Sequence, residues 1–133
     1  MPAMGNNCLL AFDFGLKHIG VAVGQLITKT ATGITTIRAK SGRPIWEDMD
    51  KLIATWDPTL LIVGLPLNMD DTESEFTVEA RRFAKQLDKR FGLPVKMVDE
   101  RLTTREAMSR NAKKSHEISA ILIAETWLNE QCH

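Results

Sequence analysis

Residues 9–24 read LLAFDFGLKHIGVAVG and decide the fold class of this chain. Residues 9–14 form an apolar run of strand length that ends at a turn glycine, and residues 19–24 alternate branched side chains with Gly or Ala. This pattern predicts a β-hairpin. Gly20 and Gly24 share the face opposite to the branched side chains, where another backbone or a ligand can come close because no side chain is in the way.

The rest of the chain alternates between strand and helix patterns. The expected elements are, in order, a strand at Ala31–Ala39, a helix from Pro44 to before Pro58, a strand at Leu60–Val63, a helix at Phe76–Phe91, a strand at Val95–Val98, a short helix from Thr103 or Thr104 to about Ala112, and a helix at about Ser115–Asn129. The order βββαβαβαα predicts an α/β fold with a five-stranded mixed sheet and helices on both faces. One domain would span residues 1–133, with short flexible ends at about 1–7 and 130–133.

The composition is that of an ordinary globular domain. Of the 133 residues, 44% are apolar and 26% are charged, with 17 Lys and Arg against 17 Asp and Glu. No apolar run approaches the ~20 residues of a membrane helix and no signal-peptide pattern is present, so we expect a cytoplasmic protein. Cys8 and Cys132 belong to no zinc-binding pattern and the histidines form no HExxH motif, which gives a zinc hydrolase no support.

The zero net charge hides a segregation along the chain. Residues 81–114 carry eleven Lys and Arg against four Asp and Glu, a net charge of +7, and the remainder carries −7. A basic segment on a neutral protein is typical of polyanion binding. The alternative is that these are ordinary solvated helix faces.

Two acidic residues end predicted strands. Asp13 follows four apolar residues, and Glu100 closes the strand at Val95–Val98. If the two strands are neighbours, the carboxylates converge at one edge of the sheet, where Mg²⁺ takes one or two carboxylates and leaves positions for water and phosphate oxygens. A pair of such ions can assist phosphodiester hydrolysis. Alternatively, Asp13 caps a turn and Glu100 pairs with Arg101.

Four segments carry a resemblance to a known family, namely AFDFG at 11–15, IGVAVG at 19–24, VGLPLNMD at 63–70 and DERLTT at 99–104. In their order and spacing they resemble the YqgF/RuvX family, from about Leu9 to Leu128. That family has the RNase H-like fold. Its members are assigned to maturation of the 5′ end of the ribosomal RNA precursor of the small subunit, pre-16S rRNA, or to Holliday junction resolution.

The resemblance implies a set of catalytic and metal-binding residues. Asp13 corresponds to the first metal ligand and Glu100 to the second acid, with Asp99 as its possible substitute. The third acid of the family is replaced here by His116, which Glu117 follows. The implied cofactor is Mg²⁺ or Mn²⁺, as two ions, and the imidazole of His116 suits Mn²⁺ better than Mg²⁺.

The resemblance also implies nucleic acid as the partner. The expected phosphate contacts include Lys17 in the hairpin turn and Arg101 beside Glu100. The others come from a segment that is shorter than is usual in the family, and they are Arg105, Arg110, Lys113 and Lys114. Structured RNA, pre-16S rRNA above all, is the expected substrate, with branched DNA second and the ribosome as a further partner. The chain is expected to be a monomer or a weak homodimer.

Two other functions stay open at this point. The Asp-x-Gly hairpin also resembles the phosphate-binding turn of actin-like ATPases and sugar kinases, but those enclose their nucleotide between two lobes and 133 residues supply one. A non-catalytic RNA-binding or ribosome-assembly module is the other alternative, because His116 and the short segment before it depart from the family pattern.

Overall fold

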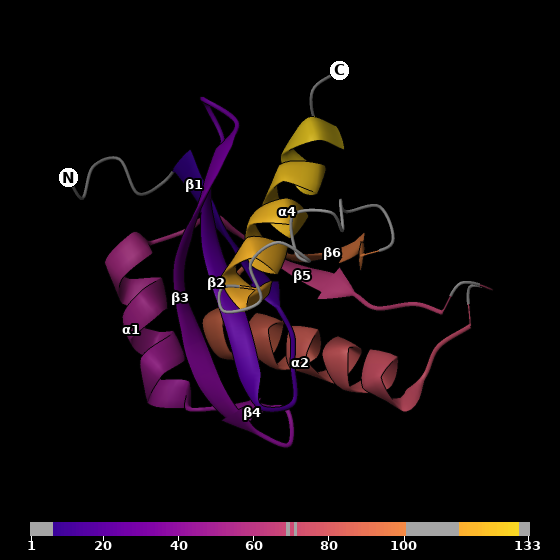
Figure 1. Cartoon of the computed structure of the whole chain (residues 1–133). Helices are drawn as coiled ribbons and strands as arrows, with labels where there is room; N and C mark the ends of the chain where they lie inside the picture. Colours follow the sequence, from indigo (N-terminus) through magenta and orange to yellow (C-terminus); the bar gives the residue numbers. More distant parts are fainter. Residues whose placement is uncertain (1–6, 69, 71, 101–114, 131–133) are drawn as a thin grey trace.

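The computed structural model describes residues 7–68, 70, 72–100 and 115–130, and a mixed sheet forms its centre (Figure 1). The elements in chain order are β1 (Cys8–Asp13), β2 (His18–Gln25), β3 (Thr30–Lys40), β4 (Arg43–Pro44), α1 (Trp46–Trp56), β5 (Leu60–Leu65), α2 (Glu75–Phe91), β6 (Val95–Asp99) and α4 (Ser115–Glu130). The strands lie side by side in the order β4-β3-β2-β1-β5-β6.

Strand β1 lies in the interior of this sheet and sets its register. It pairs with β2 in antiparallel fashion, which places Asp13 opposite Gly20, and with β5 in parallel fashion, which places Phe12 beside Val63. Strand β5 in turn pairs with β6 in parallel fashion. The carboxyl ends of β1, β5 and β6 therefore meet at the same edge of the sheet, where α/β proteins bind their ligands.

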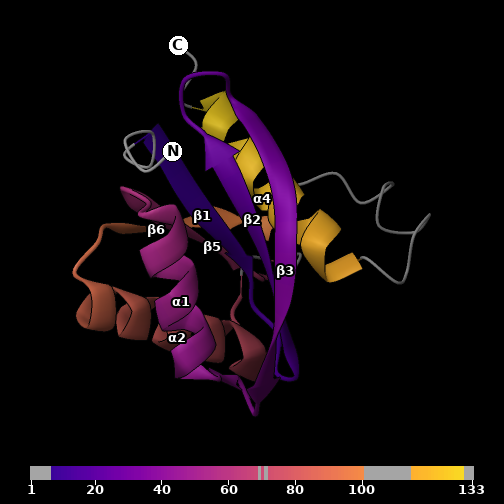
Figure 2. The ribbon, with the colours of Figure 1, turned by 90° about the vertical axis from the view of Figure 1, so that its left-hand side faces the viewer.

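Helices cover both faces of the sheet, as the sequence predicts (Figure 2). Leu10 and Phe12 of β1 belong to the core cluster under α1 and α2. Leu9 and Ala11 belong to a second cluster with residues of α4, because alternate residues of a strand face opposite sides. Burial on both faces explains why β1 is apolar along almost its whole length.

The structure corrects the sequence analysis in two places. The sheet has six strands rather than five, because Arg43 and Pro44 pair with the end of β3 and form β4, so Pro44 precedes α1 instead of starting it. Strand β6 lies at the edge of the sheet and β5 separates it from β1, so the two strands that carry the acids are not neighbours. The short helix expected before Ala112 lies outside the described residues.

Two further findings concern the cysteines and the helices. Cys8 is buried in the core, and its thiol donates a hydrogen bond to the carbonyl of Trp56, whereas Cys132 lies outside the described residues. Within the described ranges, no helix has both the length and the apolar character that crossing a membrane requires.

Candidate functional site

Asp13 and Glu100 meet across an intervening strand. Asp13 ends β1, Glu100 follows β6, and β5 lies between them with Gly64 near its end. The two carboxyl groups share a hydrogen bond. A Cβ atom on Gly64 would lie 2.9 Å from Cγ of Glu100, so the missing side chain at this position is what lets Glu100 reach over β5.

The environment of Asp13 opposes its ionisation. Its side chain is 15% exposed, and burial together with the charge and hydrogen bond of Glu100 raises the pKa of Asp13 from 3.8 to about 8. A carboxyl group that is buried beside a second carboxyl group is an unfavourable arrangement unless a cation compensates the charge. The same arrangement is typical of functional sites.

The amino end of α4 brings His116 to the same place. Nδ1 of His116 lies 3.7 Å from Oδ2 of Asp13, and the imidazole is 45% exposed. Gly20, which is paired with Asp13 on β2, permits this approach, since a Cβ atom there would overlap the carbonyl oxygen of His116. From the sequence, either another backbone or a ligand was expected to come close at Gly20, and in the structure the backbone of α4 does so.

His18 is a site residue that the sequence analysis did not include. Its ring centroid lies 5.4 Å from that of His116, and it shares the α4 side of β2 with Gly20 because the two residues are two positions apart. Burial and, second, the charge of His18 lower the pKa of His116. Since the pKa of Asp13 is raised, the contact between His116 and Asp13 joins two groups that both favour their neutral forms.

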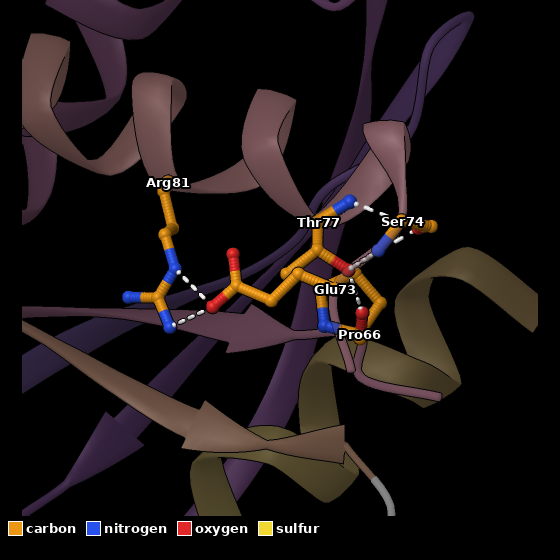
Figure 3. A network of polar contacts seen from close by, with 5 residues as sticks. All are labelled: Pro66, Glu73, Ser74, Thr77 and Arg81. Atoms are coloured by element: carbon orange, nitrogen blue, oxygen red, sulfur yellow. Dashed lines mark hydrogen bonds and ion pairs between the residues drawn. The ribbon is translucent and has the colours of Figure 1, made fainter. Parts of the chain in front are cut away.

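The loop after β5 is fixed at the rim of this site by the first turn of α2 (Figure 3). The hydroxyl of Thr77 donates to the carbonyl of Pro66 and accepts from the backbone N–H of Ser74, whose own side chain caps the helix. Two N–H groups of Arg81 donate to one carboxylate oxygen of Glu73, at 2.9 and 2.6 Å, and lower the pKa of Glu73. The backbone that follows Gly64 is thereby held in one position.

The donors at this edge fit a divalent cation. Asp13 and Glu100 offer carboxylate oxygens and His116 offers an imidazole nitrogen, and a bound cation would relieve the unfavourable burial of Asp13. Within the described ranges, no three His, Cys, Asp or Glu side chains are arranged closely enough to hold an ion by themselves. An ion here would take much of its coordination from water or phosphate oxygens, as Mg²⁺ usually does.

The expected phosphate contacts are only partly placed by the structure. Lys17 is exposed in the turn between β1 and β2, where its carbonyl accepts from the N–H of Ala39. Arg101, Arg105, Arg110, Lys113 and Lys114 lie outside the described residues. Of the basic residues on α2, Arg81, Arg82 and Arg90 form ion pairs with acids of the chain, which reduces their availability to a polyanion.

Comparison with known proteins gives the relatives of the chain. A family model described as "RuvX: Holliday junction resolvase" matches residues 7–130. Proteins named "Putative pre-16S rRNA nuclease" from Aeromonas hydrophila and Yersinia pestis are each 46% identical over 138 aligned positions, which cover 96% of this chain and 99% of each relative. A protein of the same name from Mannheimia succiniciproducens is 50% identical over 130 positions, covering 90% of this chain and 93% of that protein.

Solved structures give the fold. RuvC of T. thermophilus in complex with Holliday junction substrate has a TM-score of 0.61 at 15% identity and covers 93% of this chain and 94% of its own. The fowlpox virus Holliday junction resolvase has a TM-score of 0.54 at 11% identity and covers 92% of this chain and 98% of its own. The RNase H-like fold expected from the sequence is therefore confirmed.

Proposed function

The chain belongs to the RuvX family, and we propose from this membership and from the site that it is a divalent-metal-dependent nuclease. The single observation that carries the proposal is the hydrogen-bonded pair of Asp13 and Glu100 in a largely buried position. Strands β1 and β6 and the missing side chain at Gly64 are arranged so that these carboxyl groups meet, which is costly for stability and useful for holding a cation.

Each residue of the site has a role in this proposal. Asp13 and Glu100 hold the metal, Mg²⁺ or Mn²⁺, and His116 contributes a nitrogen ligand from the amino end of α4. When bound at these residues, two such ions would make a coordinated water more nucleophilic and would offset negative charge on the departing oxygen. Hydrolysis forms a new P–O bond to the oxygen of water and breaks the bond between phosphorus and the 3′ oxygen, which leaves as a hydroxyl. No covalent intermediate with the protein is needed.

The proposed substrate is the 5′ leader of pre-16S rRNA, processed in the cytoplasm during ribosome biogenesis. The names of the relatives at 46–50% identity support this choice, because those proteins match the chain over nearly its whole length. Because those matches extend over nearly the whole chain, they also support a single domain over residues 1–133. The basic segment at 101–114 supports a nucleic acid partner, since in the sequence it directly follows Glu100 and directly precedes α4.

Holliday junction resolution is the second candidate, favoured by the family description. Cutting two symmetric strands of a junction requires two active sites, and therefore a dimer, whereas leader processing does not. We propose a monomer or a weak homodimer. Sedimentation of the protein at micromolar concentration separates the candidates, because a strict monomer counts against junction resolution.

The test is cleavage of three labelled substrates by the wild-type chain and by Asp13→Asn, with Mg²⁺ or Mn²⁺ in turn. The substrates are a single-stranded RNA, a precursor RNA carrying the 5′ leader and a four-way DNA junction. We expect metal-dependent cleavage of the precursor by the wild type, and a loss of at least about a hundredfold in Asp13→Asn. Cleavage that survives in Asp13→Asn would show a contaminating nuclease. Binding without cleavage, with either metal, would establish the non-catalytic RNA-binding module instead.

A further inference from the structure

A basic surface lies next to the site on a part of the sheet that the sequence analysis did not consider. It consists of Arg38 and Lys40 of β3 and Arg43 of β4, all of which are exposed. The described residues include no ion-pair partner for any of the three. They lie outside the segment at 81–114 in which the basic charge of the chain is concentrated.

All three side chains lie on the same face of the sheet as Asp13. Ile37 and Ala39 pack into the core under α1 and α2, so their neighbours Arg38 and Lys40 face the side that carries α4. Directly opposite residues of an antiparallel pair share a face, and Arg43 is directly opposite Lys40. The same rule places Arg38 beside His18.

This part of the face is not covered by α4. The helix begins over Gly20 and continues over Gly33. It therefore runs away from the start of β2 and the end of β3, where the basic residues lie. Figure 1 shows the lower ends of β2 and β3 extending past the first turn of α4. The surface starts at Arg38. This residue lies two strands from Asp13, which is about 10 Å across the sheet, and about 7 Å further along the strand direction.

The hairpin between β3 and β4 holds two positive charges together at a cost. Ser41 and Gly42 both have positive φ, 53° and 82°, which is the geometry of a tight two-residue turn, and this turn fixes Lys40 opposite Arg43. Like charges at directly opposite positions destabilise a strand pair. An anion bound between them would remove that repulsion.

The same hairpin is fastened to the loop that follows Asp13. The N–H of Gly42 donates to the carbonyl of Leu16 at 2.9 Å, and a Cβ atom on Gly42 would lie 2.8 Å from Cζ of Phe14, the residue after Asp13. The basic surface and the carboxylate of Asp13 are therefore held at a fixed separation by a backbone hydrogen bond and by packing against the ring of Phe14. A fixed separation is what a surface needs in order to set which phosphate of a strand reaches the site.

We infer that the phosphodiester backbone of the substrate crosses the ends of β2, β3 and β4 that α4 does not cover, with its phosphates contacted by Arg38, Lys40 and Arg43. This inference rests on the proposed function for the choice of ligand. Charge contacts of this kind position a strand without reading its bases. They add affinity that falls steeply with salt, because each contact releases condensed counterions.

The test compares two double variants with the same net charge. Lys40→Gln with Arg43→Gln removes two charges from the basic surface, and Lys51→Gln with Lys85→Gln removes two exposed charges from α1 and α2 on the opposite face. Fluorescence anisotropy in EDTA measures binding of a labelled RNA leader and of a four-way DNA junction over a range of salt. Melting temperatures verify that both variants fold, and we expect the first to be at least as stable as wild type.

We expect the variant of the basic surface to bind at least one of the two ligands about tenfold more weakly, with the slope of log K against log salt reduced by about two. The control should bind both ligands within about twofold of wild type. Equal losses in the two variants, or no loss on either ligand, would overturn the inference. Because binding is measured without cleavage, a chain that binds on this surface but does not cut would refute the nuclease proposal alone.

Discussion

Asp13 and Glu100 share a hydrogen bond although their strands are not neighbours, because the strand between them carries Gly64 where a side chain would block the contact. The site thus depends on a residue that supplies no functional group. In the same way Gly20 supplies only the space that the backbone of His116 occupies. Gly20 on β2 and Gly64 on β5 lie on either side of β1. They make room for His116 of α4 and for Glu100 after β6 to reach the carboxyl group of Asp13.

Replacement of Gly64 by Ala should damage the site more than the fold. The new Cβ atom would lie 2.6 Å from Cδ1 of Ile123 and 2.9 Å from Cγ of Glu100, so both side chains have to move away from it. We expect a loss of about 1–3 kcal/mol in the free energy of unfolding, from overpacking, and a loss of cleavage of at least about tenfold. Urea denaturation and the cleavage assay measure the two effects.

Gly92→Ala is the matched control for Gly64→Ala. No atom lies within 4 Å of a Cβ on Gly92, but its φ of 66° is unfavourable for Ala, so about 1–2 kcal/mol of stability should be lost without any steric effect on the site. Cleavage per folded molecule should stay at the wild-type value. If both variants lose cleavage in proportion to stability, Gly64 has no special role in the site.

The stability of the metal-free protein should fall as the pH rises from 6.5 to 8. Asp13 has a folded-state pKa of about 8 against 3.8 in the unfolded chain, so the folded form binds more protons over this range and is favoured by acid. The lowered pKa of His116 acts in the opposite direction, but only below about pH 6.5, where the unfolded chain protonates its imidazole. Above pH 8 the contribution of Asp13 levels off.

Asp13→Asn isolates this effect, since the amide cannot ionise. The difference in unfolding free energy between Asp13→Asn and wild type, measured in EDTA, should grow by more than about 1 kcal/mol in favour of the variant between pH 6.5 and 8. Mn²⁺ in place of EDTA should reverse the difference, because the cation binds the ionised carboxylate of the wild type. A pH-independent difference would mean that Asp13 is ionised throughout.

The fold could be predicted from the sequence because its signals are local. Period-two alternation marked β2 and helical spacing marked α2. The face assigned to Gly20 indicated a close approach by a backbone or a ligand, and a backbone lies there. The turn between β3 and β4 was missed because Pro44 also suits the start of a helix, although the dipeptide Ser41-Gly42 is itself a turn signal.

The assembly of the site could not be predicted in the same way, because strand order is not written in any local pattern. The sequence placed Asp13 and Glu100 at strand ends but left open whether their strands are neighbours. Nothing local in the sequence indicates that Gly64 makes room for Glu100 above β5. His18 was missed for a related reason. His18 belongs to the site because α4 places His116 next to it, and the residue pattern of β2 does not predict where α4 lies.

The two histidines lead to a prediction about metal preference. If His116 is a metal ligand, His116→Asp replaces a nitrogen donor by an oxygen donor, and cleavage with Mg²⁺ should rise relative to cleavage with Mn²⁺. His18→Gln serves as the control: it removes a neighbouring positive charge, so it should raise the pKa of His116 in an NMR titration without changing the ratio of the two metals. An unchanged ratio in His116→Asp would remove His116 from the ligand set.

The loop at the rim should depend on one buried hydroxyl. Thr77 is fully buried, donates to the carbonyl of Pro66 and accepts from the N–H of Ser74, and Thr77→Val keeps its shape while removing both hydrogen bonds. We expect a loss of about 1–3 kcal/mol in unfolding free energy, because two backbone groups lose their partner. Cleavage should fall further than the folded fraction does, because the backbone after Gly64 is released next to Glu100. Arg81→Gln breaks only the exposed ion pair with Glu73 and should leave the free energy of unfolding almost unchanged. Equal effects of the two substitutions on cleavage would show that the position of Pro66 does not matter to the site.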